Sequence, residues 1–299
     1  MSESQPAGIE PVSFVRRLIT GALFSIVLLS ALIAGNRYFV LPALCAVFAL
    51  IGSNEFYDLT APQMNKFVRI IGCVLAVALP VITVFARLFI PENPVIGTGG
   101  LAGLSALFFV VAISLVVYLG WVAFTPTSRA RDAALSFFGA LYTGIPLSFV
   151  VLIREMERGE YLAPMIVLSV LAADSFAYLG GSLFGRHKLA PVISPKKSWE
   201  GFFAGTLGSI VVWSILPFFT HNPYSFWVAI FVGTLVSVAS LVGDLFESRL
   251  KREANVKDSG TLLPGHGGLL DRIDSILLVS LVMFSLLSTV GVLLGVVTI

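Results

Sequence analysis

Charged residues are scarce in this chain of 299 residues: only 12% are Asp, Glu, Lys or Arg, and 57% are hydrophobic. A typical soluble domain carries roughly 25% charged residues, so this composition excludes a water-soluble globular protein. Basic residues are in almost no excess, because 19 Lys and Arg against 17 Asp and Glu leave a formal net charge of +2. That balance gives no sign of a nucleic-acid partner. We therefore expect the lipid bilayer to be the main solvent of this protein.

Cysteine is almost absent. The two cysteines, Cys45 and Cys73, both lie inside apolar stretches. They support neither a disulfide framework nor a cysteine-based metal cluster, and we interpret them as packing residues in the membrane. The pattern GxxxxGK[ST] is also missing, so an ordinary P-loop ATPase is not indicated.

What the sequence does contain is a series of nine long apolar stretches separated by short gaps. Each is on the order of 20 residues long, the length of helix that crosses about 30 Å of hydrocarbon. They should be helices, because an open sheet cannot satisfy its backbone polar groups in lipid. We therefore predict an all-α, polytopic integral membrane protein with about nine transmembrane helices. Their approximate cores are residues 18–34, 38–53, 70–86, 101–124, 133–153, 164–184, 202–217, 226–245 and 276–297.

The Lys and Arg residues fall mainly in alternate gaps, which indicates an orientation. With the N-terminus in the cytoplasm, 15 of the 19 lie on the cytoplasmic side, and four lie on the other: Arg37, Arg87, Arg154 and Arg158. Such an excess is the positive-inside bias of membrane proteins. We predict a cytoplasmic N-terminus, a C-terminus on the opposite side, and a multi-pass location in the cell (cytoplasmic or inner) membrane.

The two halves of the chain differ in character. Residues 1–160 contain five expected spans joined by short loops of ordinary composition. Residues 161–299 contain four spans, and their polar residues gather in two loops on the cytoplasmic side, 185–201 and 247–274. We expect the catalytic region within residues 161–299, with its active site facing the cytoplasm.

Two polar features stand out before residue 201. Asp174 lies inside the sixth apolar stretch, where an unpaired carboxylate costs at least a few kcal/mol. It marks either a functional site or a polar packing contact between helices. The loop 194–201 contains Ser194, Lys196 and Lys197. Lysines and hydroxyls suit phosphate oxygens, although a basic patch that only meets anionic lipid headgroups is an alternative.

Carboxylates mark the ends of two later spans. On a continuing helix, Asp244, Glu247 and Ser248 share one face, and Asp271 and Asp274 repeat the arrangement before the last span. Two such helix ends at one membrane face could hold Mg²⁺, which takes oxygen ligands and is normally completed by water and substrate phosphates. The alternative is solvated helix ends, or ion pairs with Arg272.

Basic and glycine-rich residues fill the segment between these helix ends. Lys251, Arg252 and Lys257 come first, and the run 265–268, Gly-His-Gly-Gly, precedes the helix that carries Asp271. Glycines before a helix start expose backbone N–H groups that favour phosphate. Together with the carboxylates they predict a site for a nucleoside triphosphate with Mg²⁺. His266 either donates to phosphate or caps the turn.

The 27 residues from Ser248 to Asp274 resemble the signature of the phosphatidate cytidylyltransferases, also called CDP-diglyceride synthetases. The matching residues include Lys251-Arg252, Lys257-Asp258 and the run Pro-Gly-His-Gly-Gly-Leu-Leu-Asp-Arg-Ile-Asp at 264–274. The segment 174–201 is also similar to this family. The resemblance covers roughly residues 170–299.

The resemblance implies a reaction, CTP plus phosphatidate giving CDP-diacylglycerol and pyrophosphate. It also implies Mg²⁺, a second and monovalent cation such as K⁺, and a homodimer in the lipid bilayer. The implied metal ligands are principally Asp244 and Asp271, with Asp174 and Asp274 in support. The implied groups that neutralise or bind phosphate are Lys251, Arg252, Lys257 and Arg272 as cations, His266, Gly267 and Gly268 in the loop, and Ser194, Lys196, Lys197 and Ser248.

Two other functions are compatible with the residues alone. One is a related CTP-using membrane enzyme, such as a polyprenol kinase or a cytidylyltransferase for another lipid phosphate. The other is a secondary transporter in which Asp174 and Asp244 bind protons or ions. The sequence shows no repeat symmetry, and its acidic residues gather at one face beside basic loops, which favours the enzyme.

Overall fold

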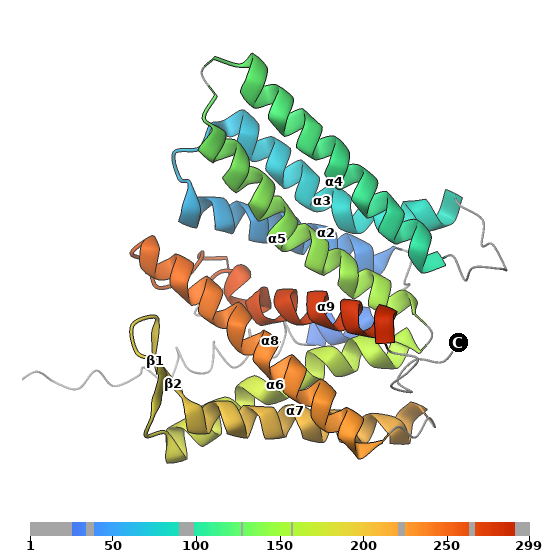
Figure 1. Ribbon diagram of the computed structural model, residues 1–299, viewed down its shortest axis with the longest axis vertical. Coiled ribbons are helices and arrows are strands. Elements are labelled where there is room, and N and C mark those ends of the chain that lie inside the picture. The colour runs from blue at the N-terminus through green and yellow to red at the C-terminus, as the bar shows by residue number, and fades with distance from the viewer. Residues whose placement is uncertain are drawn as a thin grey trace, which may run out of the picture.

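The computed structural model describes residues 26–33, 39–89, 99–126, 128–156, 158–220, 225–262 and 267–290. The predicted all-α architecture is confirmed in outline (Figure 1). Residues 26–33 are helical. They are followed by α2 (Val40–Thr60), α3 (Lys66–Phe89), α4 (Gly99–Phe124), α5 (Ala130–Glu155), α6 (Gly159–Phe184), α7 (Trp199–Thr220), α8 (Phe226–Glu253) and α9 (Leu270–Val290).

One element was not predicted from the sequence. Residues between α6 and α7 form a two-stranded antiparallel hairpin, with β1 at Lys188–Ala190 and β2 at Ser194–Ser198. Lys188 pairs with Ser198, Ala190 pairs with Ser194, and the register is irregular between these pairs. The loop that was expected to bind phosphate therefore has a fixed backbone.

Among the residues that the structure describes, six helical segments are long and apolar enough to cross a membrane, so the chain is a multi-pass membrane protein. They are Val40–Thr60, Lys66–Phe85, Gly103–Phe124, Ala130–Glu155, Gly159–Phe184 and Phe226–Glu253. These correspond to the second to sixth and eighth predicted spans. α7 and α9 lie where the seventh and ninth were predicted but are not among the six, and only residues 26–33 of the first predicted span are described. The total of nine, and the orientation, remain predictions.

The helices lie in two groups with α9 between them (Figure 1). α2, α3, α4 and α5 pack together in the first group, and α6, α7 and α8 form the second. α9 packs against α8 but also against α5, α2 and α6. The last helix of the chain therefore joins the two groups, and the predicted boundary near residue 160 stays a prediction.

Glycines bring α6 and α7 unusually close together. A Cβ atom on Gly201 would lie 2.7 Å from the carbonyl oxygen of Ala177, and one on Gly205 would lie 2.6 Å from that of Ala173. Small residues permit this approach of two backbones in a membrane. The close contact fixes the position of Asp174 on α6 and of the hairpin that connects the two helices.

Candidate active site

A cavity of about 440 Å³ lies between α6, α7, α8, α9 and the hairpin. Most of the residues selected from the sequence line it, although they come from positions up to 100 residues apart. They are Asp174, Ser194, Lys196, Lys197, Asp244, Lys251, Asp271, Arg272 and Asp274. The structure thus brings the two predicted polar loops and the acidic helix ends to one place.

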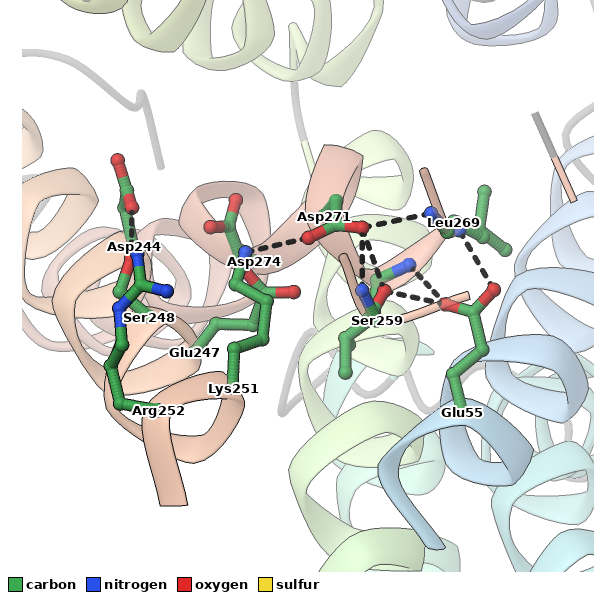
Figure 2. Close-up of polar contacts among 12 residues, drawn as sticks. Glu55, Asp244, Glu247, Ser248, Lys251, Arg252, Ser259, Leu269, Asp271 and Asp274 are labelled. Atoms are coloured by element: carbon green, nitrogen blue, oxygen red, sulfur yellow. Dashed lines mark hydrogen bonds and ion pairs between the residues drawn. The ribbon is translucent and has the colours of Figure 1, made fainter. Parts of the chain in front are cut away.

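Lys251 on α8 links two carboxylates at one side of this cavity (Figure 2). Its Nζ lies 2.6 Å from Oε2 of Glu247, one helical turn earlier, and 2.6 Å from Oδ1 of Asp271 on α9. The Glu247 side chain is only 1% exposed. Its other oxygen, Oε1, has no hydrogen-bond partner among the described residues. This side of the cavity therefore retains an unused acceptor.

The second oxygen of Asp271 holds the loop that precedes α9. Oδ2 accepts hydrogen bonds from the amide of Ser259 at 2.8 Å, the hydroxyl of Ser259 at 3.0 Å and the amide of Gly268 at 2.8 Å. Gly267 has φ +84°, a left-handed conformation that favours glycine. The turn thus directs the Gly268 amide to a protein carboxylate, and its predicted role toward phosphate stays a prediction.

Asp244 is held from two sides at the opposite wall of the cavity. Its Oδ2 lies 2.6 Å from Nζ of Lys197 on the hairpin. The hydroxyl of Ser248 donates to its Oδ1 at 3.1 Å, which confirms that Asp244 and Ser248 share one face of α8. Each of the two aspartates selected as principal metal ligands is therefore paired with a lysine from one of the predicted basic loops.

Glu200, in the first turn of α7, fixes the base of the hairpin. Its carboxylate accepts from the amides of Arg186 at 3.1 Å and His187 at 3.2 Å, and it contacts Nδ1 of His187 at 2.6 Å. The hydrogen bond with the His187 ring is the main reason that the pKa of Glu200 is lowered to about 2. The amide of Gly201 donates to the hydroxyl of Ser198, which caps the start of α7. Lys197 is thus presented by an anchored strand.

Asp174 and Asp274 also line the cavity, Asp174 as an exposed residue of α6 and Asp274 as a buried residue of α9. Asp174 accepts a hydrogen bond of 3.4 Å from Ser240 on α8, and Asp274 accepts one of 2.6 Å from the amide of Ser275. Both interact electrostatically with Asp244. Within the described part of the chain, no three His, Cys, Asp or Glu side chains form a group that could hold a metal ion. A cation bound here would need oxygens from water or substrate as well as protein.

Five selected residues that the structure describes are not in the cavity lining: Ser248, Arg252, Lys257, Gly267 and Gly268. Arg252 donates from Nε to the carbonyl oxygen of Ile193 at 3.2 Å, which ties α8 to the turn of the hairpin. Lys257 is exposed in the loop after α8. His266 lies outside the described residues.

Sequence analysis missed Glu55, a buried carboxylate near the end of α2 (Figure 2). It accepts hydrogen bonds from the hydroxyl of Ser259 at 3.1 Å and from the amides of Leu269 at 3.0 Å and Leu270 at 2.7 Å. Asp174 lies within the predicted span 164–184, whereas Glu55 follows the predicted span 38–53 by two residues, so the rule that marks ionisable groups inside apolar stretches does not select Glu55. It also lies in residues 1–160, whose composition gives no sign of a site.

Comparison with known proteins identifies the family of this chain. The family model described as the cytidylyltransferase family matches residues 15–290. The chain belongs to the cytidylyltransferase family. The match includes the first half, so the relationship extends well beyond the segment 170–299 that carried the resemblance.

Relatives of this cytidylyltransferase share about a third of its residues. Phosphatidate cytidylyltransferases of Staphylococcus epidermidis and Staphylococcus aureus are each 34% identical over 267 residues, covering 88% of this chain and 95% of the relative. Phosphatidate cytidylyltransferase 4, chloroplastic, of Arabidopsis thaliana is 32% identical over 306 residues, covering 92% of this chain and 73% of the relative. Family membership favours nucleotidyl transfer over the transporter alternative.

Proposed function

We propose that this chain transfers CMP from CTP to phosphatidate, giving CDP-diacylglycerol and pyrophosphate. The observation that carries the proposal is a cavity lined by both carboxylates and lysines, in a chain whose relatives over most of its length are phosphatidate cytidylyltransferases. Substrates of this kind need a place where several negative charges are neutralised beside lipid. The cavity lies at the polar ends of helices that otherwise present apolar side chains.

The proposed step is a displacement at phosphorus. An oxygen of the phosphatidate phosphate forms a bond to the α-phosphorus of CTP. The bond between that phosphorus and the oxygen bridging to the β-phosphate breaks, and pyrophosphate leaves with the electron pair. No general base is needed, because the attacking phosphate oxygen is already ionised near neutral pH. Positioning and charge neutralisation are the main catalytic contributions to such a step.

The basic residues of the cavity are proposed to hold the phosphates. Lys197 and Lys251 pair with Asp244 and Asp271 in this structure. A lysine ammonium sits on a flexible four-carbon stem, so each can turn from its carboxylate toward an entering phosphate oxygen. The same role is proposed for the other cations and phosphate-binding groups, which are Ser194, Lys196, Ser248, Arg252, Lys257, His266, Gly267, Gly268 and Arg272.

We also propose that the carboxylates hold Mg²⁺ when substrate is bound. Asp244 and Asp271 would be the ligands, with Asp174 and Asp274 in support and a monovalent cation such as K⁺ nearby. The donor set suits Mg²⁺, which usually takes one or two carboxylates together with water and phosphate oxygens. The buried Oε1 of Glu247, to which no described residue donates a hydrogen bond, is a further oxygen at the same cavity. Bound Mg²⁺ would supply charge neutralisation at the transferring phosphate.

The proposed setting is the cytoplasmic face of the cell membrane, in a homodimer with nine spans per chain. The distribution of Lys and Arg supports this orientation, because the cavity opens among loops that carry nine of the 15 Lys and Arg residues assigned to the cytoplasmic side. CTP is a cytoplasmic metabolite, and a site at helix ends can receive a phosphate headgroup while the acyl chains stay in lipid. Cross-linking in membranes would test the dimer.

The test uses the purified full chain in detergent micelles that contain phosphatidate. CTP carries ³²P at the α-phosphate in one reaction and at the γ-phosphate in a parallel one. We expect α-label, and no γ-label, to enter the lipid in the presence of Mg²⁺ and not when Mg²⁺ is chelated. Folded Asp271→Asn should lose the transfer.

Three other outcomes would each contradict one part of this proposal. Label from the γ-phosphate in the lipid would identify a kinase. Absence of label with wild-type protein that is demonstrably folded would refute phosphatidate as the acceptor. Near-normal transfer by Asp271→Asn would refute Asp271 as a metal ligand.

A further inference from the structure

Glu55 connects the first group of helices to the segment that carries the proposed catalytic groups. It lies on α2, which does not line the cavity, and its side chain is buried. All three of its hydrogen-bond donors lie in the segment 259–270. These contacts join residues more than 200 positions apart in the sequence, and they connect α2 to the signature segment 248–274.

Two of these contacts stabilise the start of α9. The amides of Leu269 and Leu270 stand at the first turn of that helix, where backbone N–H groups have no partner within the helix itself. A carboxylate is favoured at this end because the helix dipole is positive there. Glu55 supplies it from another helix, so the beginning of α9 is fixed relative to α2. Asp271 is the next residue of α9.

The third contact leads directly to Asp271. The hydroxyl of Ser259 lies 3.1 Å from Oε2 of Glu55 and 3.0 Å from Oδ2 of Asp271. Because a hydroxyl carries one proton, the two carboxylates share it through Ser259. The backbone amide of Ser259 also donates to Asp271. A continuous series of contacts therefore runs from Glu55 through Ser259 and Asp271 to Lys251 at the cavity (Figure 2).

Glycines make room for this arrangement. A Cβ atom on Gly268 would collide with the hydroxyl of Ser259 and lie 2.5 Å from Oε2 of Glu55. One on Gly260 would also lie 2.5 Å from the Glu55 carboxylate. At such distances the side chain of Glu55 or Ser259 would have to move, so glycine at both positions lets the loop close on Glu55 in its present arrangement. The loop is therefore shaped around this side chain.

We propose that Glu55 is a positioning residue for CMP transfer. By docking the segment 259–270 on α2, it fixes the side chain of Asp271 so that Oδ1 and the ammonium of Lys251 face the cavity. The proposal rests on the proposed function. Reacting groups must be held close to their productive geometry, and a displacement of about 1 Å can reduce turnover about 100-fold.

The test compares Glu55→Gln with Asp58→Asn. Both replace a carboxylate of α2 by its amide, but Asp58 is half-exposed and pairs with Arg69 at 2.7 Å, away from the loop. In Glu55→Gln, the amide NH₂ faces donors that need an acceptor. Since a hydrogen bond to a charged group is worth a factor of about 10 to 100, we expect kcat to fall by that factor, with the KM for CTP changed less.

Hydrogen exchange of the amides of Leu269 and Leu270, measured by mass spectrometry, gives a readout that does not depend on activity. We expect it to accelerate about tenfold or more in Glu55→Gln and not in Asp58→Asn. Ser259→Ala is a milder variant, because the amides of Leu269 and Leu270 still donate to Glu55. When Ser259→Ala is already present, adding Glu55→Gln should lower kcat by a smaller factor than it does in wild type, because both changes interrupt the same series of contacts.

The outcomes separate the two proposals. Wild-type protein that transfers no CMP refutes the proposed function, and the exchange result still decides whether Glu55 docks the loop. Unchanged exchange in Glu55→Gln overturns the docking. Faster exchange with wild-type kcat, or fully additive effects of Glu55→Gln and Ser259→Ala, overturns the positioning role. If Glu55→Gln does not fold, wild-type kcat in Ser259→Ala overturns it as well.

Discussion

A polar cluster inside the first group of helices differs from the side chains around the cavity in its charge. In the first group, Tyr57 donates to the carbonyl oxygen of Ser136 at 2.7 Å. The Ser136 hydroxyl donates to the carbonyl oxygen of Val68 at 2.8 Å and meets the hydroxyl of Tyr118 at 2.7 Å. These neutral groups join α2, α3, α4 and α5.

The cavity cluster is charged and incompletely satisfied. Lysines meet carboxylates across separate elements, and Oε1 of Glu247 is buried without a partner among the described residues. These charged side chains line an open cavity, where an entering ligand can exchange contacts with them. The comparison separates polar groups that hold helices together from polar groups that are available for chemistry.

The largest effect should come from removing one cavity carboxylate. Asp244→Asn should reduce CMP transfer roughly 1000-fold, equivalent to about 4 kcal/mol in the activation barrier, because it removes a proposed metal ligand. Thermal unfolding in detergent should stay close to wild type, since the ion pair with Lys197 is partly exposed.

Asp58→Asn is the matched control, because Asp58 also forms an ion pair with a basic side chain, at 2.7 Å. It should keep wild-type transfer. Equal losses in the two variants would show that the charge of Asp244 has no special role. A loss that is confined to Asp244→Asn would sharpen the distinction between the two regions.

The second-largest effect should appear in both the free energy of unfolding and the rate of CMP transfer. Lys251→Met should destabilise the fold by about 3 kcal/mol, because removing one partner of a buried ion pair leaves an uncompensated charge. Lys251 is 14% exposed and Glu247 is 1% exposed, so solvent offers little compensation. Transfer should also fall, since a proposed phosphate ligand is lost. Chemical denaturation in mixed micelles measures the first quantity.

The double variant Lys251→Met with Glu247→Gln tests the explanation. Neutralising Glu247 should restore part of the stability, since Asp271 stays without its cation, and none of the transfer. Recovery of both would contradict a role for Lys251 in binding substrate. Recovery of neither would mean that the loss of stability arises from something other than the buried charge.

Sequence reasoning located the elements of the site better than it located their contacts. Apolar stretches about 20 residues long were sufficient to place α2 to α6 and α8, since length and hydropathy dominate in a bilayer. Helical periodicity also placed Asp244 and Ser248 on one face. The pairing of Lys197 with Asp244 could not be predicted, because it depends on how closely α6 and α7 pack.

Two features needed the structure. The strands Lys188–Ala190 and Ser194–Ser198 lack the alternation of apolar and polar residues that indicates a strand, and backbone contacts to Glu200 hold the hairpin instead. Glu55 is separated from Leu270 by 215 residues, and no local pattern connects them. Long-range contacts of single side chains carry no periodic signal in one sequence.

A moderate effect should follow from breaking the neutral cluster of the first group. Ser136→Ala removes the bond to Val68 and leaves the hydroxyl of Tyr118 without this partner. The cost should be about 2 kcal/mol of unfolding free energy, because each buried hydrogen bond contributes about 1 kcal/mol. Transfer per folded molecule should stay at the wild-type level.

Ser114→Ala is the control for this variant, since the Ser114 hydroxyl donates to the carbonyl oxygen of Val111 in its own helix and bonds to no other element among the described residues. It should change the unfolding free energy by less than about 0.5 kcal/mol. A drop in transfer by folded Ser136→Ala would contradict the view that this cluster serves packing alone.

The smallest effect should distinguish Lys197 from Lys251 by the structural element on which each lies. Lys251 lies within a helix, whereas Lys197 depends on a hairpin that Glu200 anchors. Glu200→Gln should raise the KM for CTP about two- to fourfold and leave kcat unchanged, because exposed contacts of this kind are weak. Steady-state kinetics over a range of CTP concentrations measures both.

The pH dependence follows from the lowered pKa of Glu200, about 2 against an ordinary value of 4.5, with the His187 hydrogen bond as the main cause. A depressed pKa means that the carboxylate stabilises the hairpin fully above about pH 4.5 and loses this effect only as the pH falls toward 2. The increase in KM should therefore be constant from about pH 7 to about pH 9. Glu253→Gln, which alters an exposed pair with Arg249, is the control and should change neither constant. A fall in kcat in Glu200→Gln would instead place Glu200 in the transfer step and remove the contrast between a helix-borne and a hairpin-borne lysine.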